Sequence, residues 1–204
     1  MKKTVVFDFD KTLTMHDTLL SFFCFNEKKT PFFVFKFCIY ILCMVLTKFN
    51  IIHNINLKKI GIYLFLRYAN SGHLNNKLQE FGKSDYVKYS KLFKGLIFDT
   101  NTNYYVVSAS FEEYIKPMFP VFVQIIGSKL TQDRKNRTVL EYNCFGKDKP
   151  IALFRHGINH IDEFYTDSYE DLPLAKISKN IIIVDGDNLI RCNNVYEFID
   201  FFKR

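Results

Sequence analysis

The sequence predicts an α/β fold, a Rossmann-like doubly wound and mostly parallel sheet with an inserted all-helical cap. Short, continuous apolar runs recur along the chain, and helical patterns separate most of them. Continuous rather than alternating apolar residues are typical of strands that are covered on both faces. Strands and helices in alternation build a parallel sheet with helices on both sides. A chain of 204 residues is long enough for one such domain that carries an insertion.

Five segments have the strand pattern, and the first of them ends on two acidic residues. We expect strands at residues 4–10, 103–110, 121–128, 163–168 and 180–187.

Helical patterns lie between or after these strands. We expect helices at residues 84–98, 110–119 and 194–202, and an exposed hairpin or loop at 129–143. Ser110 and Glu113 have the spacing of a capping box, which places a helix start near 108–110.

Residues 18–89 interrupt the alternation and form the predicted cap, so the catalytic core is expected at 1–17 and 90–204. The cap has no strand signal. It contains two apolar runs, at 31–47 and 60–69.

The longer apolar run raises the question of a membrane. As a helix, residues 30–47 would extend roughly 27 Å, which is marginal for crossing a bilayer. A single crossing is excluded, because the strands before and after the cap belong to one sheet. Lys58 and Lys59 precede the short second run and argue against two spans. We favour a cap that lies on or dips into the membrane interface, with its basic residues facing anionic headgroups. A soluble cap that buries its Phe-rich faces, and a spanning hairpin, stay open.

The composition limits the partners and the compartment. The net charge of +7 suits an anionic partner, although a solvated basic surface explains it equally well. The five cysteines form no CxxC pair and no zinc spacing, which fits a reduced environment. Acidic residues interrupt any secretory signal near the N-terminus. We therefore expect a cytoplasmic protein, peripheral on the inner face of the cytoplasmic membrane, with no nucleic acid partner.

Asp8 and Asp10 at the end of the first strand are the first candidate site. Side chains alternate along a strand, so both carboxylates project to the same side. Like charges at that spacing repel one another, and burial makes the repulsion worse. The arrangement is tolerable only if a cation or another neutralising group comes between them.

Three further segments place polar residues at the carboxyl ends of predicted strands, where open α/β sheets carry their sites. The segment "VVSAS" ends with Ser108 followed by Ala109, "NCFGKDKP" carries Lys149, and "YTDSYEDLP" carries Asp167 and Asp171.

Together these segments resemble the four signature motifs of the haloacid dehalogenase superfamily of phosphatases. The first is DxDxT, here Asp8, Asp10 and Thr12, followed by a serine, a lysine and DSxxD in the expected order. The resemblance covers residues 1–17 and about 95–187. The residues of these motifs are similar to those of the subfamily with a helical C1 cap, subfamily IB. This subfamily includes phosphoserine phosphatase-like and phosphatidylglycerophosphatase C-like enzymes.

The resemblance implies a role for each acidic residue. Asp8 is expected to be the nucleophile that forms an aspartyl-phosphate. Asp10 is expected to protonate the leaving oxygen, to activate water afterwards, and to ligate Mg²⁺ through its backbone carbonyl. Asp8 and Asp167 are the other expected metal ligands. Thr12 would hold the loop of the first motif, and Asp171 would act through water or by hydrogen bonds.

The resemblance also implies a phosphate site. The Ser108 hydroxyl and the Ala109 N–H are expected to hold phosphate oxygens, and Lys149 to neutralise the nucleophile and the phosphoryl group. Lys147 stays open as the alternative lysine. Pro150 fits the first turn of a helix. Lys11 stands at a position that is often Gly in the family.

These inferences predict a Mg²⁺-dependent phosphomonoesterase. The substrate we favour is a phospholipid headgroup phosphate, similar to phosphatidylglycerophosphate, presented at the membrane surface. The alternative is a small soluble phosphometabolite, such as phosphoserine, an amino-alcohol phosphate or a sugar phosphate. A more remote alternative is an inactive binding or scaffold protein on the same fold.

Overall fold

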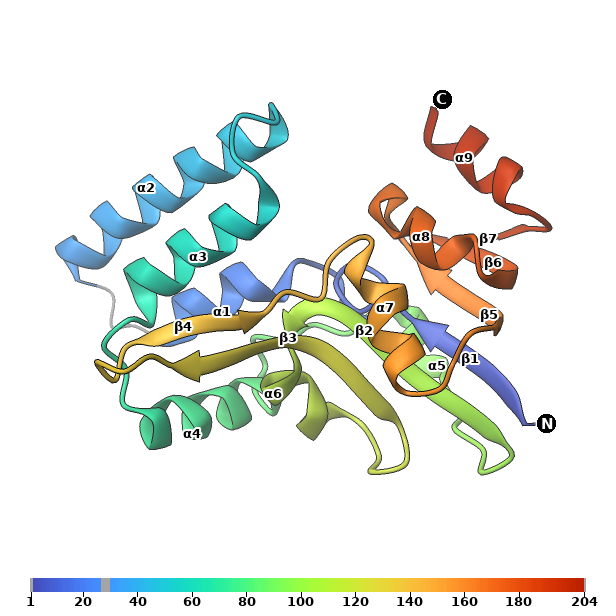
Figure 1. Cartoon of the computed structure of the whole chain (residues 1–204), viewed down its shortest axis with the longest axis horizontal. Coiled ribbons are helices and arrows are strands. Elements are labelled where there is room, and N and C mark those ends of the chain that lie inside the picture. Colours follow the sequence, from blue (N-terminus) through green and yellow to red (C-terminus); the bar gives the residue numbers. More distant parts are fainter. Residues whose placement is uncertain (1, 27–29, 204) are drawn as a thin grey trace.

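The computed structural model describes residues 2–26 and 30–203, and the described chain forms one seven-stranded sheet between helices (Figure 1). The strand order is β4-β3-β2-β1-β5-β6-β7. The five central strands run parallel, and the two edge strands pair antiparallel with their neighbours. The strands are β1 (Lys3–Phe7), β2 (Thr102–Phe111), β3 (Gln124–Gln132), β4 (Thr138–Tyr142), β5 (Ile161–Thr166), β6 (Ser178–Asp185) and β7 (Asn188–Cys192). The predicted fold class is confirmed.

All five predicted strands are present as β1, β2, β3, β5 and β6. The segment 129–143 is a hairpin, in which the end of β3 turns back into β4. Residues 1, 27–29 and 204 of the predicted ranges lie outside the described residues.

Two apolar clusters cover the two faces of the sheet. Successive residues of β1 serve opposite faces: Val5 and Phe7 belong to one cluster and Val6 to the other. The first cluster includes the helical insertion, α6 (Glu112–Ile115) and the 3₁₀ helix η1 (Lys116–Met118). The second includes α7 (Asp148–Arg155), α8 (Leu172–Ala175) and α9 (Val195–Lys203). The expected helix at 194–202 is α9. Burial on both faces explains why the strand sequences are continuously apolar.

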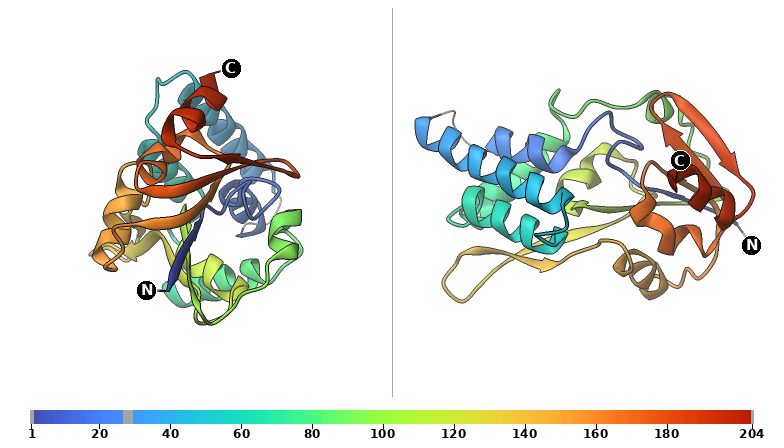
Figure 2. Two further views of the ribbon diagram at one scale, coloured as in Figure 1. Left: turned by 90° about the vertical axis from the view of Figure 1, so that its right-hand side faces the viewer. Right: turned by 90° about the horizontal axis from the view of Figure 1, so that it is seen from above.

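Of the described helices between β1 and β2, four lie within the range predicted for the cap. They are α1 (Thr18–Asn26), α2 (Pro31–Lys48), α3 (Asn54–Phe65) and α4 (Ser71–Gly82). Figure 2 shows them gathered at one end of the molecule, away from both termini. This is the end to which the parallel strands point their carboxyl termini (Figure 1), so the cap stands over the predicted site.

The helix α3 packs closely against α1 and α2. Its buried residues are spaced as one helical face: Lys58, Gly61, Ile62 and Phe65. A Cβ atom on Gly61 would lie 2.5 Å from the ring of Phe23, so only glycine allows this approach. One lysine therefore lies on the buried face of the cap.

The prediction of a helix at 84–98 is wrong for most of that range. Only α5 (Lys91–Gly95) is helical, and Tyr89 forms a β-bridge with Thr14 instead. The Ser90 side chain caps α5 by accepting a hydrogen bond from Phe93 N–H, and its hydroxyl donates to the Thr12 carbonyl oxygen. Tertiary bonds to the loop of the first motif therefore overrode the helical pattern of this segment.

The helix expected at 110–119 is also shorter than predicted. β2 continues to Phe111, α6 begins at Glu112, and the helix has no side-chain cap. The expected capping box does not form, because the Ser110 hydroxyl bonds to Asp10 instead. The positive helix end that we expected at 108–110 is therefore not there.

Candidate active site

Asp8, Lys149 and Asp171 form a buried ionic triad. Asp8 follows β1, and Lys149 lies in the first turn of α7, as does Pro150. The Lys149 ammonium nitrogen lies 2.6 Å from Oδ1 of Asp8 and 2.5 Å from Oδ1 of Asp171. Lys147, the alternative lysine, is exposed. The geometry places Lys149 at the expected nucleophile.

Asp171 contacts the lysine directly rather than through water. It lies in the 3₁₀ helix η2 (Tyr169–Asp171) and is only 1% exposed. Its second oxygen, Oδ2, accepts a hydrogen bond of 2.8 Å from the Thr166 hydroxyl. Asp171 is thus held by the end of β5 and in turn positions the Lys149 ammonium between two carboxylates.

Asp167 is joined to the first motif through Thr12. The Thr12 hydroxyl accepts from the Asp167 N–H at 3.0 Å and lies 3.2 Å from Asp167 Oδ1. These contacts tie the loop after β1 to the end of β5. Lys11 in the same loop has φ = +58°, a left-handed conformation that glycine adopts more easily.

Asp10 is held by both the cap and the core. Its Oδ1 accepts hydrogen bonds from the Thr18 N–H at 2.7 Å and from the Thr18 hydroxyl at 2.6 Å. Its Oδ2 accepts one of 2.5 Å from the Ser110 hydroxyl. Burial, with a further contribution from the charge of Asp17, raises the pKa of Asp10 to about 6. A carboxyl with that pKa can both donate and accept a proton near neutral pH.

The predicted phosphate-binding residues lie on a bulge at the end of β2. Pairing with β3 shifts register between Val107 and Phe111, so Ser108, Ala109 and Ser110 leave the regular ladder. The Ser108 hydroxyl is buried and accepts from the Ser110 N–H at 3.0 Å. The predicted phosphate-binding residues therefore lie on a bulge rather than at a helix end.

Lys58 of the cap is the residue that sequence reasoning missed. Its ammonium group donates to the Ala109 carbonyl oxygen at 2.6 Å, to the Ser128 hydroxyl at 3.0 Å and to the Asn143 side-chain oxygen at 2.5 Å. We expected this lysine to face lipid headgroups, but it is 3% exposed. Burial lowers its pKa to about 8. The spacing that it shares with Gly61 and Ile62 was the available signal.

Thr18 was also missed as a site residue. It is fully buried at the start of α1, and its hydroxyl lies 2.9 Å from the Tyr114 hydroxyl as well as close to Asp10. Its position a few residues after Thr12, where the chain passes from the first motif into the cap, was the only sequence signal.

The site carries more negative than positive charge. Burial, which outweighs the attraction of Lys149, raises the pKa of Asp8 well above its usual value, and the charges of Asp171 and Asp167 raise it further. Burial likewise raises the pKa of Asp167. Burial alone would lower the pKa of Lys149, but the Asp171 and Asp8 carboxylates raise it. This lysine stays charged, and the remaining carboxylate charge calls for a further cation.

The oxygens at this site suit a hard divalent cation. Among the described residues no three acidic, histidine or cysteine side chains gather around one point. A Mg²⁺ ion does not need three, because it keeps several waters and binds through one or two carboxylates. The carboxylates of Asp8 and Asp167 and the backbone carbonyl of Asp10 fit this requirement. A cavity of about 570 Å³ borders Asp167 and Lys11 and leaves room for a ligand.

A comparison of the chain with models of protein families shows to which family it belongs. The model of the haloacid dehalogenase-like hydrolases matches residues 5–176, which include all of the motif residues. The chain belongs to this family. It is therefore a hydrolase, and the enzyme class expected from the sequence is confirmed. None of the curated proteins compared with the chain matches it significantly.

Solved structures that are similar in fold to this haloacid dehalogenase-like hydrolase include phosphatase-like proteins. A phosphoserine phosphohydrolase-like protein from Francisella tularensis is 15% identical, with a TM-score of 0.64 over 98% of this chain and 99% of that one. A protein of unknown function from Bordetella pertussis Tohama I is 16% identical, with a TM-score of 0.64 over 86% of both chains. A phosphoserine phosphatase from T. onnurineus is 18% identical, with a TM-score of 0.59 over 100% of this chain and 96% of that one. At these identities the likeness shows the fold.

Proposed function

We propose that the protein is a Mg²⁺-dependent phosphomonoesterase that works through an aspartyl-phosphate on Asp8. The observation that carries the proposal is the position of Lys149, which lies within hydrogen-bond distance of both Asp8 and Asp171 in a buried site. Lys149 stays charged, so it offsets the negative charge of Asp8 at the point where a phosphate dianion must approach. The family membership supports the same chemistry.

The first half-reaction transfers the phosphoryl group to the protein. A carboxylate oxygen of Asp8 forms a bond to phosphorus while the bond from phosphorus to the ester oxygen breaks. Asp10, whose pKa is about 6, donates its proton to that leaving oxygen. Mg²⁺, when bound, would neutralise charge on the phosphoryl oxygens and on Asp8.

The second half-reaction returns the protein to its starting state. Asp10, now a carboxylate, takes a proton from water as the water oxygen bonds to phosphorus and the bond to Asp8 breaks. The hydrogen bonds from Thr18 and Ser110 hold the Asp10 carboxylate in place for both proton transfers. The products are inorganic phosphate and free Asp8.

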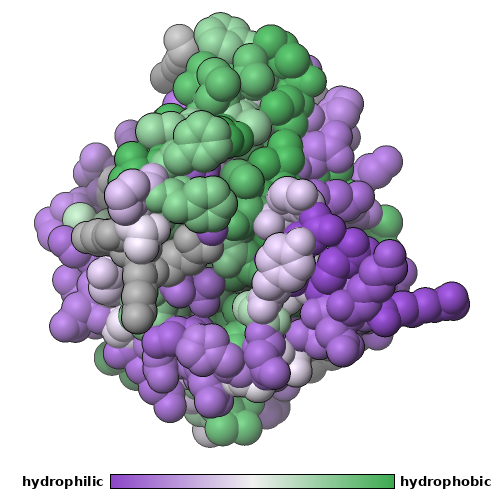
Figure 3. Space-filling view, turned by 90° about the vertical axis from the view of Figure 1, so that its left-hand side faces the viewer, coloured by the Kyte–Doolittle hydropathy of each residue, from purple (hydrophilic) through white to green (hydrophobic). Residues whose placement is uncertain are grey.

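The substrate we propose is a phosphorylated amphiphile, such as a phospholipid headgroup phosphate, presented at the inner face of the cytoplasmic membrane. The exposed apolar surface of the cap supports a lipid substrate. By length and composition, α2 is the one helix of the described chain that qualifies as a membrane span, and only 11% of its 18-residue window is buried. Phe35, Leu42 and Val45 are exposed along one face of α2, and Phe49 continues that face just beyond its end. Figure 3 shows the resulting apolar surface over the upper part of this end of the molecule.

The length of α3 favours a peripheral position over a spanning hairpin. At 1.5 Å per residue its 12 residues extend about 18 Å, far short of the hydrocarbon core. Its buried face also packs on α1 and the hairpin β3–β4. We therefore propose that the exposed face of α2 rests in the membrane interface.

A small soluble phosphometabolite is the second candidate. The observation in its favour is the similarity in fold to phosphoserine phosphatase over nearly the whole chain. The exposed apolar face of α2 has no part in that function, so we rank it second.

Phosphate release from p-nitrophenyl phosphate tests the reaction. We expect activity that EDTA abolishes and Mg²⁺ restores, and that Asp8→Asn lowers at least a thousandfold. Asp85→Asn, which makes the same change at an exposed position, is the matched control. Absence of activity in the wild-type protein with Mg²⁺ would favour the inactive scaffold. A comparison of kcat/KM for lipid and soluble phosphomonoesters, phosphoserine included, then separates the two candidates.

A further inference from the structure

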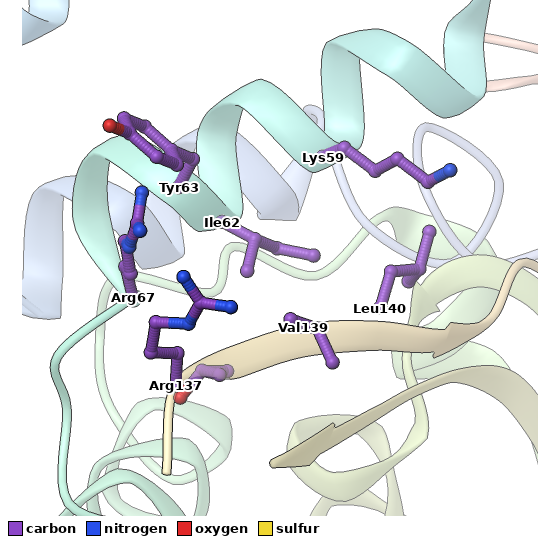
Figure 4. Close-up of a pocket in the computed structure, with 8 residues that line it drawn as sticks. Lys59, Ile62, Tyr63, Arg67, Arg137, Val139 and Leu140 are labelled. Carbon is purple, nitrogen blue, oxygen red and sulfur yellow. The ribbon is translucent and has the colours of Figure 1, made fainter. Parts of the chain in front are cut away.

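A basic pocket lies between α3 of the cap and β4 of the hairpin, and Ile62, which shares the buried face of α3 with Lys58, is among its lining residues. It has a volume of about 310 Å³ and is open to solvent. Figure 4 shows Lys59 and Tyr63 on α3, Arg67 just beyond its end and Arg137 just before β4. Its lining residues include three cationic side chains and no acidic one.

Two polar side-chain atoms of its lining residues have no hydrogen-bond partner in the described structure. These are Nε of Arg67 and the hydroxyl of Thr138, whose residue is 3% exposed. The Arg67 guanidinium is held over the rings of Tyr63, at 4.3 Å, and Tyr68, at 5.3 Å, so it is oriented without a carboxylate. Unpaired buried donors are costly, and an anion in the pocket would satisfy both.

Arg137 adds charge to the same space. It forms an ion pair with Asp133, and Figure 4 shows its guanidinium group rising beside that of Arg67. Asp133 compensates one of the three cations, which leaves Lys59 and Arg67 in excess. The charge of the pocket therefore fits an anion such as a phosphate group.

A largely apolar cavity, whose lining also includes Lys36 and His73, adjoins the basic pocket. Its volume is about 540 Å³, and it shares Tyr63 and Arg67 with the pocket. Its other lining residues include Phe32, Phe35, Ile39, Leu64 and Phe65. Two of these, Phe32 and Phe35, are more than 60% exposed on α2. A basic pocket and an apolar groove thus meet at one tyrosine–arginine pair.

We propose that this double pocket is a non-catalytic binding site for an anionic phospholipid. The headgroup phosphate binds Arg67, Lys59 and the Thr138 hydroxyl, and an acyl chain lies in the groove along Phe32 and Phe35. The inference extends the membrane association proposed above and does not depend on the reaction at Asp8. A bound lipid would anchor the cap while Lys58, one turn before Ile62 on α3, holds the carbonyl of Ala109.

Short-chain dihexanoylphosphatidylglycerol, used below its micelle concentration, tests the site. As a phosphodiester it is not a substrate for a monoesterase. Its binding is followed by titration calorimetry and by the ¹⁵N–¹H signal of the Arg67 side-chain Nε. We expect saturable binding of one molecule and a large shift of that signal, because an unpaired N–H gains an acceptor.

Matched variants locate the binding. Arg67→Gln and Thr138→Val should each weaken it about tenfold, the loss expected for a hydrogen bond to a charged group. Arg134→Gln removes the same charge from an exposed position of the hairpin outside the pocket and should change affinity less than twofold. If a variant fails to fold, the shift of the wild-type signal still decides.

Four results would overturn the proposal: no binding of the lipid, unchanged affinity in Arg67→Gln, no shift of the Arg67 signal, or inorganic phosphate binding there as tightly as the lipid. The last would assign the pocket to free phosphate. Lack of lipid binding alongside normal hydrolysis of p-nitrophenyl phosphate would remove this site and leave the phosphatase proposal standing.

Discussion

The ammonium group of Lys58 lies 2.6 Å from the backbone carbonyl oxygen of Ala109. This bond joins α3 of the cap to the bulge in which the phosphate-binding residues are expected. The same ammonium group reaches Ser128 on β3 and Asn143 just after β4. A single cap residue therefore fixes the position of the bulge relative to its neighbouring strands.

Replacing Lys58 should impair catalysis without removing any group that touches the substrate. We expect Lys58→Met to lower kcat/KM for p-nitrophenyl phosphate by about 10- to 100-fold, because a small displacement of the bulge misplaces the phosphate. Lys83→Met, the same change at an exposed lysine just after α4, is the control and should retain normal activity. Equal activity in the two variants would show that the bulge does not need this bond.

The stability of the protein should depend on pH through Lys58. Its pKa is about 8 in the folded protein, against 10.5 for an unperturbed lysine. Between these values the unfolded state binds more protons, so the free energy of unfolding rises with pH. The full difference corresponds to about 3 kcal/mol.

Urea unfolding of the wild type and of Lys58→Met at pH 7.5 and 9.5 measures this effect. We expect the stability of the wild type relative to the variant to increase by about 2 kcal/mol over that interval. Other titrating groups cancel in the comparison. A constant difference would mean that Lys58 titrates normally in the folded state.

Asp171 should control both the orientation of Lys149 and the stability of the triad. Asp171→Asn leaves Asp8 as the lysine's only carboxylate partner, so we expect kcat to fall about 10- to 100-fold. Loss of one partner from a buried ion network should also lower the free energy of unfolding by about 3 kcal/mol. Glu170→Gln, at the exposed neighbouring position, should change neither quantity appreciably when activity and urea unfolding are measured together.

Asp10 should matter most when the leaving group is poor. An alkoxide needs a proton to depart, whereas p-nitrophenolate is stable without one. We therefore expect Asp10→Asn to lower kcat/KM for an alkyl phosphomonoester about 10²- to 10⁴-fold, and to lower it less for p-nitrophenyl phosphate. The ratio of the two losses is the measurement. Equal losses with both substrates would assign proton transfer to another group.

The exposed face of α2 should govern binding to membranes. Leu42→Ser combined with Val45→Ser removes two exposed apolar side chains outside the double pocket. We expect binding to anionic vesicles to fall at least tenfold in a sedimentation assay, which corresponds to about 1.4 kcal/mol. Val121→Ser with Phe122→Ser, exposed apolar residues near the start of β3, is the matched control. Wild-type protein that stays in solution at low salt would contradict the membrane proposal.

The strands and motifs were predictable because their signals are local. A continuously apolar run such as residues 181–184 is typical of a buried strand, and Asp8 and Asp10 share a face by strand geometry alone. The helix at 84–98 was wrong because Ser90 found a partner in the loop of the first motif. The predicted capping box does not form because the Ser110 hydroxyl donates its hydrogen bond to Asp10, a hundred residues away in sequence.

By itself the sequence determined the five parallel strands and their order along the chain, the positions of the motif residues at strand ends, and the length and apolarity of α2. These follow from backbone periodicity and side-chain polarity, which act over a few neighbouring residues. Only the tertiary structure decided that Lys149 rather than Lys147 meets Asp8, that Lys58 is buried against Ala109, and that Arg67 faces an open basic pocket. Each of these depends on which distant surfaces pack together, and burial then sets the charge and the hydrogen-bond partners of the side chain.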